Sequence, residues 1–557
     1  MALGVGLLLA VSAVLVQWTR VRAGPADDSS AQFVDNLRVA LETARSTLHH
    51  IMHQWEVKSY PNFLQSGGMS PEAWTLMKLK LQARVLEAAV SGRRQEWVVA
   101  FMGSSVTAGR DSPVNASFVS LTETMMRPAL LPLNVVFRSN QNAHENNPCI
   151  PYDLCVHAYA GREADMVHWE QDFNCGGNSL YAEYFIRSAL HLPKKPIIIF
   201  SHSATENWDS KVCDVPREPY RLTEHDHALI EAFKRSPRSL FTEINRKYDP
   251  IKQEWQCGEH YKAAGVQTFW HQDHQVHKCL GPFTRDWSCC SAPWHPSLKG
   301  HLLRASHHVL VWMSVYKEAM QELREQLESK ASVSLEALRS KVTESLDAFY
   351  TKHPLLPPRV KQNPLSIPDV VYCWTNYEPR SDHSTSLSAA LIDPKIAETY
   401  NRWEKDLDEW HVVVADRLHY GDDGFGRNKD IGYKDFKVVL VGHKGSGPVS
   451  FHFTTKSKGK MLVCDLAQDW NSLRYKDKGA PEKYCRLSSC TPKIYITPSS
   501  REKPSSFEFS HSTELQFQTY EGDCILSTTE LQGDFSFILT IVPQTEKRHL
   551  ISHIVIP

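Results

Sequence analysis

One serine in this chain has the local setting of a nucleophile. Residues 97–102 form a short, continuously apolar run, and Gly103-Ser104-Ser105-Val106-Thr107-Ala108-Gly109 follows it directly. If the run is a parallel strand, Ser105 stands at the carboxyl end of the sheet, where open α/β sheets bind ligands. Backbone N–H groups of a following helix would then face a developing oxyanion. Taken alone, the same pattern also suits a phosphate-binding turn or plain packing of a strand against a helix.

A serine needs a base to become a nucleophile, and His295 has the best local setting among the 27 histidines. It lies in the proline-flanked segment Ser291-Ala292-Pro293-Trp294-His295-Pro296, directly before an expected helix. Proline is favoured in the first turn of a helix, so we expect the helix to begin near Pro296. A histidine on such a loop can reach over the strand ends, whereas His301 would lie inside the helix as a packing or capping residue.

Together the two segments resemble the first and last sequence blocks of the SGNH (GDSL-type) hydrolases. Gly103 to Gly109 is similar to the block Gly-Asp-Ser-x-Thr-x-Gly, and His295-Pro296-Ser297 with Gly300-His301 is similar to Asp-x-x-His-Pro-Ser-x-x-Gly-His. The resemblance covers residues 95–315 and implies an α/β fold, a three-layer, flavodoxin-like hydrolase domain with a parallel sheet. It also implies that Ser105 is the nucleophile, that His295 is its base, and that the Ser105 N–H belongs to an oxyanion hole.

The resemblance suggests two further donors to the oxyanion hole. Ala158-Tyr159-Ala160-Gly161-Arg162 is similar to the second block of the family and points to the N–H of Gly161. The third block has an asparagine shortly after a buried strand. Here the apolar residues 197–200 are followed by Ser201 to Trp208, so Asn207 is the candidate. The alternative role for Asn207 is to cap a helix.

Two positions depart from the family pattern. Ser104 stands where the first block has an aspartate, but that residue is not the nucleophile. Ala292 stands three residues before His295, where the family has the acid of its triad, and losing such an acid can cost orders of magnitude in rate. Three alternatives follow. A Ser–His dyad works with a backbone carbonyl orienting His295, another acid such as Asp273 or Asp286 takes the role, or the domain has lost its activity.

The hydrophobic pattern indicates the elements that would position these residues. We expect N-terminal helices over 31–94, and then four apolar runs that alternate with helical stretches: 97–102, 133–137, 196–200 and 266–270. Buried strands that alternate with helices predict a mostly parallel sheet covered on both faces, which we place in a domain over 95–320.

The rest of the chain has a different pattern. Residues 321–364 predict a charged helical linker that prolines interrupt, and residues 365–557 hold many short alternating runs separated by Gly, Pro, Ser and Asp. Many short strands with regular turn signals predict a C-terminal antiparallel β-sandwich. Its aromatic residues suit an ordinary core better than a glycan-binding surface.

The N-terminus and the cysteines indicate the secretory pathway. Residues 1–23 resemble a signal peptide cleaved after Ala23, and the alternative is an uncleaved membrane anchor formed by residues 3–19. The 13 cysteines predict a disulfide framework, since pairs of them cluster in expected loops: Cys149 and Cys155, Cys289 and Cys290, Cys485 and Cys490. Asn115-Ala116-Ser117 is a glycosylation acceptor, as expected for a secreted protein or one on the extracellular face of a membrane.

Composition and charge narrow the partners. The formal net charge of −1, without a dense basic tract, gives no reason to expect a nucleic-acid partner. His271, His274 and His277 could bind zinc together with Asp273, but surface histidines are the preferred interpretation, and the mechanism needs no metal or cofactor.

The sequence thus predicts a serine esterase of the SGNH type acting on an acylated glycan or lipid. The alternatives are a transferase that uses the same serine, and a catalytically impaired SGNH-fold protein that serves as an extracellular binding module.

Overall fold

The computed structural model describes residues 28–54, 71–109, 116–144, 148–171, 179–202, 266–270, 298–329, 333–354, 371–378, 380–398, 400–401, 409–416, 436–465, 484–499, 512–520 and 524–557. Several positions predicted above therefore lie outside the described residues: residues 1–23, Asn115, Asn207, His271, Asp273, His274, His277, Asp286, Cys289, Cys290, Ala292 and His295. Within the described part, no helix is long and apolar enough to cross a bilayer.

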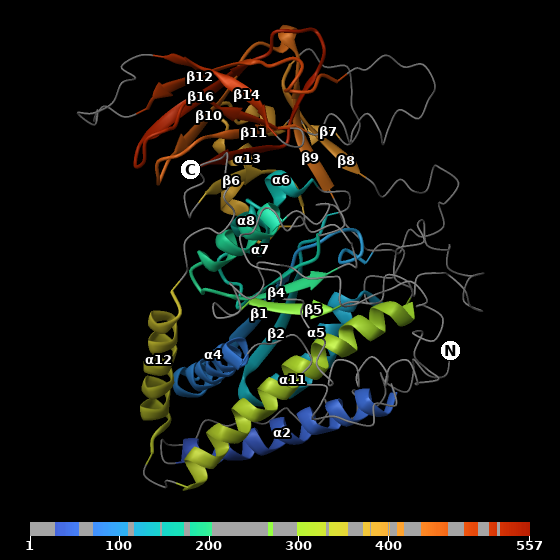
Figure 1. The fold of residues 1–557 in the computed structure, drawn as a ribbon, viewed down its shortest axis with the longest axis vertical. Coiled ribbons are helices and arrows are strands. Elements are labelled where there is room, and N and C mark those ends of the chain that lie inside the picture. Colours follow the sequence, from blue (N-terminus) through green and yellow to red (C-terminus); the bar gives the residue numbers. More distant parts are fainter. Residues whose placement is uncertain are drawn as a thin grey trace, which may run out of the picture.

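A parallel sheet forms the centre of the first half of the chain (Figure 1). Its strands are β1 (Gln95–Phe101), β2 (Val135–Gln141), β3 (Met166–Trp169), β4 (Ile197–His202) and β5 (Val266–Trp270). They are hydrogen-bonded in the order β2-β1-β3-β4-β5, and every neighbouring pair is parallel. The predicted α/β class with a parallel sheet is confirmed. The sequence reasoning did not identify β3, which is only four residues long and includes a histidine.

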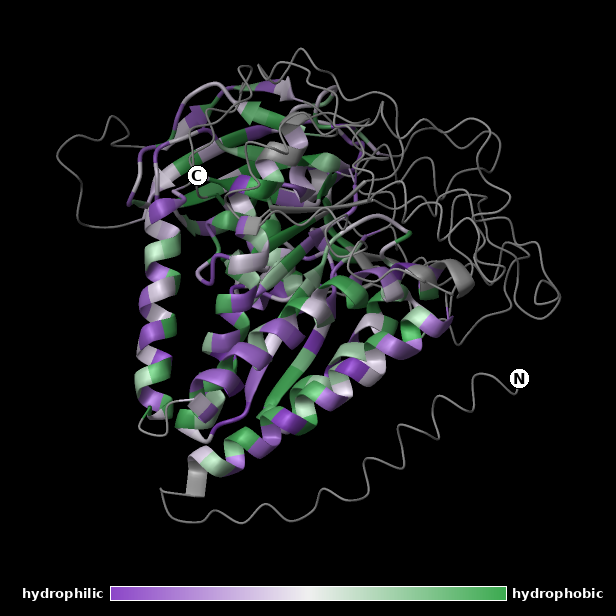
Figure 2. Cartoon of the chain, turned by 60° about the horizontal axis from the view of Figure 1, so that its bottom comes forward, coloured by the Kyte–Doolittle hydropathy of each residue, from purple (hydrophilic) through white to green (hydrophobic). Residues whose placement is uncertain are grey.

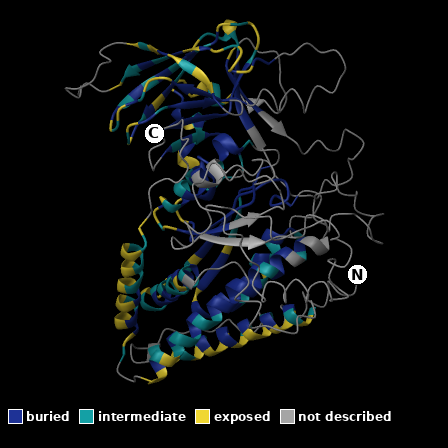
Figure 3. Cartoon of the chain, viewed as in Figure 1, coloured by how far each residue is buried: buried dark blue, intermediate teal, exposed yellow. Residues whose placement is uncertain are grey.

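Helices cover both faces of this sheet. One core joins the side chains of Trp97, Val99 and Phe101 to the first group of helices, which are α2 (Asp28–Gln54), α4 (Pro71–Ser91), α5 (Phe118–Leu130), α11 (Leu298–Ser329) and α12 (Leu335–Lys352). A second core joins Ala100 and Met102 to the opposite group, which is α6 (Cys149–Tyr152), α7 (Val156–Ala160) and α8 (Ser179–Leu190). Successive strand residues point to opposite faces, so a strand that is apolar throughout is buried on both. Figure 2 shows the same contrast between apolar strands and helices of mixed polarity, and Figure 3 shows that the exposed residues of this half gather on the outer helices such as α12.

The C-terminal region contains three further sheets within its described residues. Their orders are β10-β16-β12-β13, β14-β15-β11-β18-β6 and β17-β9-β8-β7. The strands are β6 (Tyr372–Thr375), β7 (Tyr400–Asn401), β8 (His411–Asp416), β9 (Phe436–Gly442), β10 (Val449–Thr454), β11 (Leu462–Cys464), β12 (Lys493–Pro498), β13 (Thr513–Leu515), β14 (Phe517–Tyr520), β15 (Cys524–Ser527), β16 (Ser536–Val542), β17 (His549–Ile551) and β18 (His553–Ile556). Their pairings are antiparallel, apart from β7 with β8. The predicted antiparallel character is confirmed, and one apolar core joins residues from all three sheets.

The C-terminal region packs directly on the α/β region. A disulfide joins Cys155, which precedes α7, to Cys373 in β6. The core on the α6–α8 side of the parallel sheet also includes C-terminal residues such as Tyr377 and Val555. Two more disulfides, Cys464–Cys524 and Cys485–Cys490, lie inside the C-terminal region. These pairs agree with the predicted disulfide framework.

Buried histidines lie between the parallel sheet and α11. The ring of His168, in β3, is 5.4 Å from the ring of His308, which stacks on Trp312 at a centroid distance of 4.9 Å. Burial lowers the pKa of His168 to about 3. Burial also lowers the pKa of His308, and the nearby His168 lowers it further. Both rings are therefore neutral in the folded protein at neutral pH.

These histidines should make the fold sensitive to mild acid. An unfolded histidine takes up a proton near pH 6.5 and a buried one does not, so the free energy of unfolding should fall as the pH drops below 6.5. We expect His308→Phe, which keeps a ring at the site, to reduce the loss of stability between pH 7.5 and pH 5.5 by about 1.4 kcal/mol. Urea unfolding at the two pH values measures this difference. The exposed His50 on α2 provides the control. If the free energy of unfolding depends on pH in the same way in His308→Phe and His50→Phe, the buried His308 is not a source of the acid sensitivity.

Candidate functional site

Ser105 lies where β1 ends, at the carboxyl edge of the parallel sheet, as predicted. The chain runs from β1 to β2 on one side, whereas β3 lies on the other side of β1. Open α/β sheets bind ligands at such a reversal of strand order, beyond the carboxyl ends of the two strands, which are here β1 and β3. Residues 103–109, which we call the nucleophile turn after the predicted role of Ser105, begin just beyond this end of β1.

Backbone hydrogen bonds close the nucleophile turn. The N–H of Ala108 donates to the carbonyl of Ser104 at 3.0 Å, and the N–H of Gly109 donates to that of Val106 at 3.1 Å. Gly103 allows this tight path, because a Cβ there would lie 2.3 Å from Oγ1 of Thr107 and 3.1 Å from the carbonyl oxygen of Glu170. The glycine of the predicted motif is therefore required by close packing.

Glu170 holds the turn from the side of β3. The residue is 1% exposed, and its Oε2 accepts hydrogen bonds from the Ser104 hydroxyl at 2.8 Å and from the Thr107 hydroxyl at 2.9 Å. The Ser104 N–H also donates to the Glu170 carbonyl at 2.8 Å. Burying a carboxylate is costly unless donors surround it, so these contacts fix both partners. Ser104, which replaces the aspartate of the family pattern, thus joins the turn to β3.

Sequence reasoning missed Glu170 because it missed β3. A usable signal was present, since the mostly apolar run Met166-Val167-His168-Trp169 ends directly at Glu170. A carboxylate immediately after a buried strand stands at the carboxyl edge of a parallel sheet, as Ser105 does.

The end of β2 holds the turn from the opposite side. The Gln141 amide donates to the carbonyl of Thr107 at 2.6 Å, and the N–H of His144 donates to the carbonyl of Gly103 at 3.0 Å. Tyr152 bridges the two segments, since its hydroxyl donates to the carbonyl of Asn142 at 2.7 Å and accepts the N–H of Gly103 at 3.1 Å. The nucleophile turn is therefore fixed between β2 and β3.

Gly161 caps the end of α7. Its φ of +79° is accessible to glycine without strain, and its N–H donates to the carbonyl of His157 at 3.1 Å. A Cβ at this position would lie 2.7 Å from Cβ of Ser381, in the C-terminal region. The predicted role of the Gly161 N–H in the oxyanion hole stays a prediction.

The start of α11 lies beside the nucleophile turn. Nδ1 of His301 accepts the N–H of Phe118, the first residue of α5, at 3.2 Å, and the two rings stack. Gly109 packs against Ser117, since a Cβ on Gly109 would lie 2.7 Å from Cβ of Ser117. The prediction that His301 is a packing or capping residue of a helix is confirmed. His295 precedes the first residue of α11, Leu298, by three positions and lies outside the described residues.

The strand order separates β4, the strand that precedes Asn207 of the third sequence block, from the strand that leads to Ser105. Asn207 follows β4 in the sequence, and β3 separates β4 from β1. Asn207 lies outside the described residues, so its assignment stays a prediction. The zinc alternative at His271, His274 and His277 also lies outside the described part.

Elsewhere in the described part, one group has the spacing of metal ligands. Ligand atoms of Cys155, Cys373 and His553 lie within 4.8 Å of one another. The two cysteines form a disulfide, whereas metal ligation by cysteine requires thiolates. The group therefore belongs to the contact between the two regions.

No family model matches the chain, and no curated protein matches its sequence. Among solved structures, the chain is similar to a two-domain esterase (CEX) active on acetylated mannans, co-crystallized with mannopentaose, with 11% sequence identity and a TM-score of 0.35 over 89% of this chain and 97% of that one. A second crystal structure of a two-domain esterase (CEX) active on acetylated mannans shares 11% identity and gives a TM-score of 0.33 over 85% of this chain and 94% of that one. At this identity and TM-score the likeness carries no conclusion about the activity of this chain.

Proposed function

We propose that the chain is a serine esterase of the SGNH type, with a three-layer hydrolase domain over residues 95–320. The observation that carries the proposal is the position of Ser105, in a tightly held turn just beyond the carboxyl end of β1, where the strand order reverses between β1 and β3. Open α/β sheets bind their ligands at such a reversal. The contacts from Glu170 and Tyr152 supply the rigidity that a nucleophile needs.

The anchored start of α11 supports His295 as the base. His301 ties this end of the helix to Phe118, close to the nucleophile turn. His295 lies three positions before Leu298, and an extended chain of that length reaches about 10 Å. We therefore propose His295, which directly precedes this anchored end of the helix in the sequence, as the base that Ser105 requires.

The reaction is acyl transfer to water. The Ser105 hydroxyl attacks the ester carbonyl while His295 accepts its proton, and His295 then returns the proton to the leaving alcohol. The N–H groups of Ser105 and Gly161, with the side-chain amide of an asparagine as a third donor, stabilise the oxyanion. Water then releases the acid from Ser105 by the same route. Ala292 offers no carboxylate, so a backbone carbonyl or a second acid such as Asp273 or Asp286 orients the His295 ring.

The substrate and the location complete the proposal. The substrate is a carboxylic ester of a glycan or a lipid. The protein enters the secretory pathway through residues 1–23, and the disulfides of the described part suit an oxidising compartment.

A fluorophosphonate probe tests the mechanism on the full chain. The probe should modify one residue, and peptide mapping should assign the adduct to Ser105. The same preparation should release acid from a chromogenic acetyl ester, and prior labelling should block this release. Complete absence of labelling and hydrolysis would instead favour the rival function, an extracellular binding module with impaired catalysis.

Two asparagines are candidates for the third hydrogen-bond donor of the oxyanion hole, beside the N–H groups of Ser105 and Gly161. Asn207 follows β4, whereas Asn174 follows β3, the strand next to β1. Because the end of β3 borders the nucleophile turn, we expect Asn174→Ala to lower kcat by about 10²-fold or more and Asn207→Ala to change it little. Steady-state kinetics of the two variants decide between them. A large loss in Asn207→Ala alone would support the assignment made from the sequence blocks.

A further inference from the structure

One segment of the C-terminal region, residues 376–388, packs against the α/β region. Within it, the N–H of Ser381 donates to the carbonyls of Ala158 and Tyr159 at 3.2 and 3.1 Å, and the N–H of Asp382 donates to that of Ala158 at 3.0 Å. These bonds attach the segment to the end of α7, next to Gly161. The Cβ of Ser381 occupies the space that a side chain on Gly161 would need.

The Ser381 hydroxyl also reaches the end of β2. Its Oγ accepts the side-chain amides of Asn140 at 3.1 Å and Asn142 at 3.0 Å. Ser381 is thus the point at which three elements meet: β2, α7 and the C-terminal region. In sequence it lies 239 residues from Asn142.

Further hydrogen bonds connect Asn142 to the nucleophile turn. The carbonyl of Asn142 accepts the hydroxyl of Tyr152, and that hydroxyl accepts the N–H of Gly103. The N–H of Asn142 donates to the carbonyl of Phe101, the last residue of β1, at 2.9 Å. A continuous path of hydrogen bonds therefore connects Ser381 to the residues that precede Ser105.

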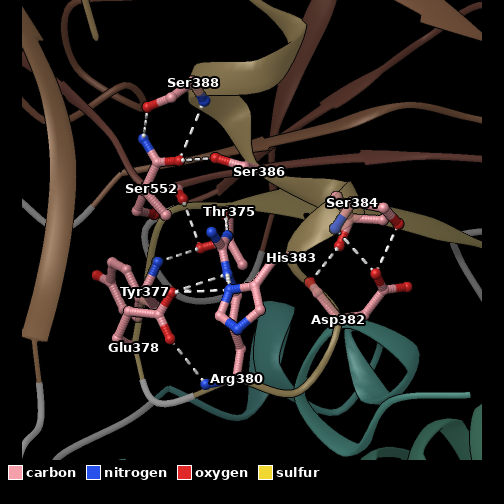
Figure 4. Close-up of polar contacts among 12 residues, drawn as sticks. Thr375, Tyr377, Glu378, Arg380, Asp382, His383, Ser384, Ser386, Ser388 and Ser552 are labelled. Atoms are coloured by element: carbon pink, nitrogen blue, oxygen red, sulfur yellow. Dashed lines mark hydrogen bonds and ion pairs between the residues drawn. The ribbon is translucent and has the colours of Figure 1, made fainter. Parts of the chain in front are cut away.

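Internal contacts make the segment a rigid support (Figure 4). Arg380 is paired with Glu378 at 3.0 Å and donates to the carbonyl of Thr375, and only 7% of its side chain is exposed. The Asp382 carboxylate accepts the N–H of Ser384 at 2.9 Å and its hydroxyl at 2.6 Å. The disulfide Cys155–Cys373 links β6, the strand directly before the segment, to the start of α7.

We propose that Ser381 is a positioning residue of the esterase site, and that the C-terminal region supports catalysis through it. This inference rests on the proposed function. Ser381 acts by holding Asn142 and the end of α7, which in turn hold the nucleophile turn and Gly161. Its loss should slow the chemical step, because a small displacement of a nucleophile lowers the rate more than it weakens substrate binding.

The test compares Ser381→Ala with Ser384→Ala in the full chain. Ser384 belongs to the same segment, and its hydroxyl bonds only to Asp382 among the contacts above, so its variant is the matched control. Titration with the fluorophosphonate probe gives the concentration of competent sites, and kcat and KM are then measured per titrated site. We expect Ser381→Ala to lower kcat about 10-fold with KM nearly unchanged, as the loss of net hydrogen-bond stabilisation predicts, and Ser384→Ala to behave like wild type.

A merely structural role of Ser381 predicts another pattern. In that case Ser381→Ala would reduce the number of titrated sites but leave kcat per site at the wild-type value, and the inference would be wrong. If this variant does not fold, Asn142→Ala removes the same bond from the other side and is judged by the same criterion. A wild-type protein that neither labels nor hydrolyses esters contradicts the proposed function itself, so the two failures are distinguishable.

Discussion

Replacing Ser105 by alanine is expected to abolish ester hydrolysis, with kcat falling by about 10⁴-fold or more. The substitution removes only the hydroxyl, and without it there is no nucleophile to form an acyl-enzyme, whatever the base and the oxyanion hole contribute. Hydrolysis of a chromogenic ester and labelling by the fluorophosphonate probe both measure the loss. Since alanine is smaller than the buried serine that it replaces, the fold should be retained.

The control for Ser105 is a serine far from the chemistry. Ser91 ends α4 and is exposed, and its hydroxyl bonds to the carbonyl of Glu87. Ser91→Ala should label and hydrolyse as the wild type does. Equal activity of Ser105→Ala and wild type would rule out the serine mechanism. If Ser105→Ala also lost its cooperative thermal unfolding transition, the loss of activity would reflect damage to the fold.

Replacing Glu170 by alanine is expected to have the second largest effect, on both stability and rate. The carboxylate accepts the hydroxyls of Ser104 and Thr107, and its removal leaves two buried donors without their acceptor. Each such loss costs about 1–3 kcal/mol, so the free energy of unfolding should fall by about 2–6 kcal/mol. We also expect kcat per titrated site to fall about 10²-fold, because the turn that carries Ser105 is no longer held from β3.

Glu170→Gln separates the two contributions of this side chain. Its amide oxygen can still accept both hydroxyls, so this variant should recover most of the stability and part of the rate. Glu96→Ala removes an exposed glutamate of β1, whose partner is Arg138 at 3.3 Å, and provides the control. Urea unfolding and active-site titration measure the outcome. If Glu170→Ala keeps full activity per titrated site, the carboxylate does not position the nucleophile.

The sequence by itself determined the features that depend on neighbouring residues. A continuously apolar run that ends in Gly103-Ser104-Ser105 predicted a buried strand with a serine at its carboxyl end, and the structure has both. The alternating pattern of the C-terminal region predicted antiparallel strands, and β16 shows this alternation of buried and partly buried residues. Such features could be predicted because the side-chain period of a strand and the conformational freedom of glycine act within a few residues.

Only the tertiary structure decided which distant residues support Ser105. Glu170, Tyr152 and Ser381 meet the nucleophile turn or its neighbours through strand order and through the packing of the C-terminal region, and no local pattern encodes either. The pairing of Ser105 with His295 stays a prediction, resting on two sequence blocks and the anchored start of α11. The physical reason for this division is that hydrophobic periodicity specifies which face of an element is buried, whereas the polar contacts of a site depend on which elements become neighbours.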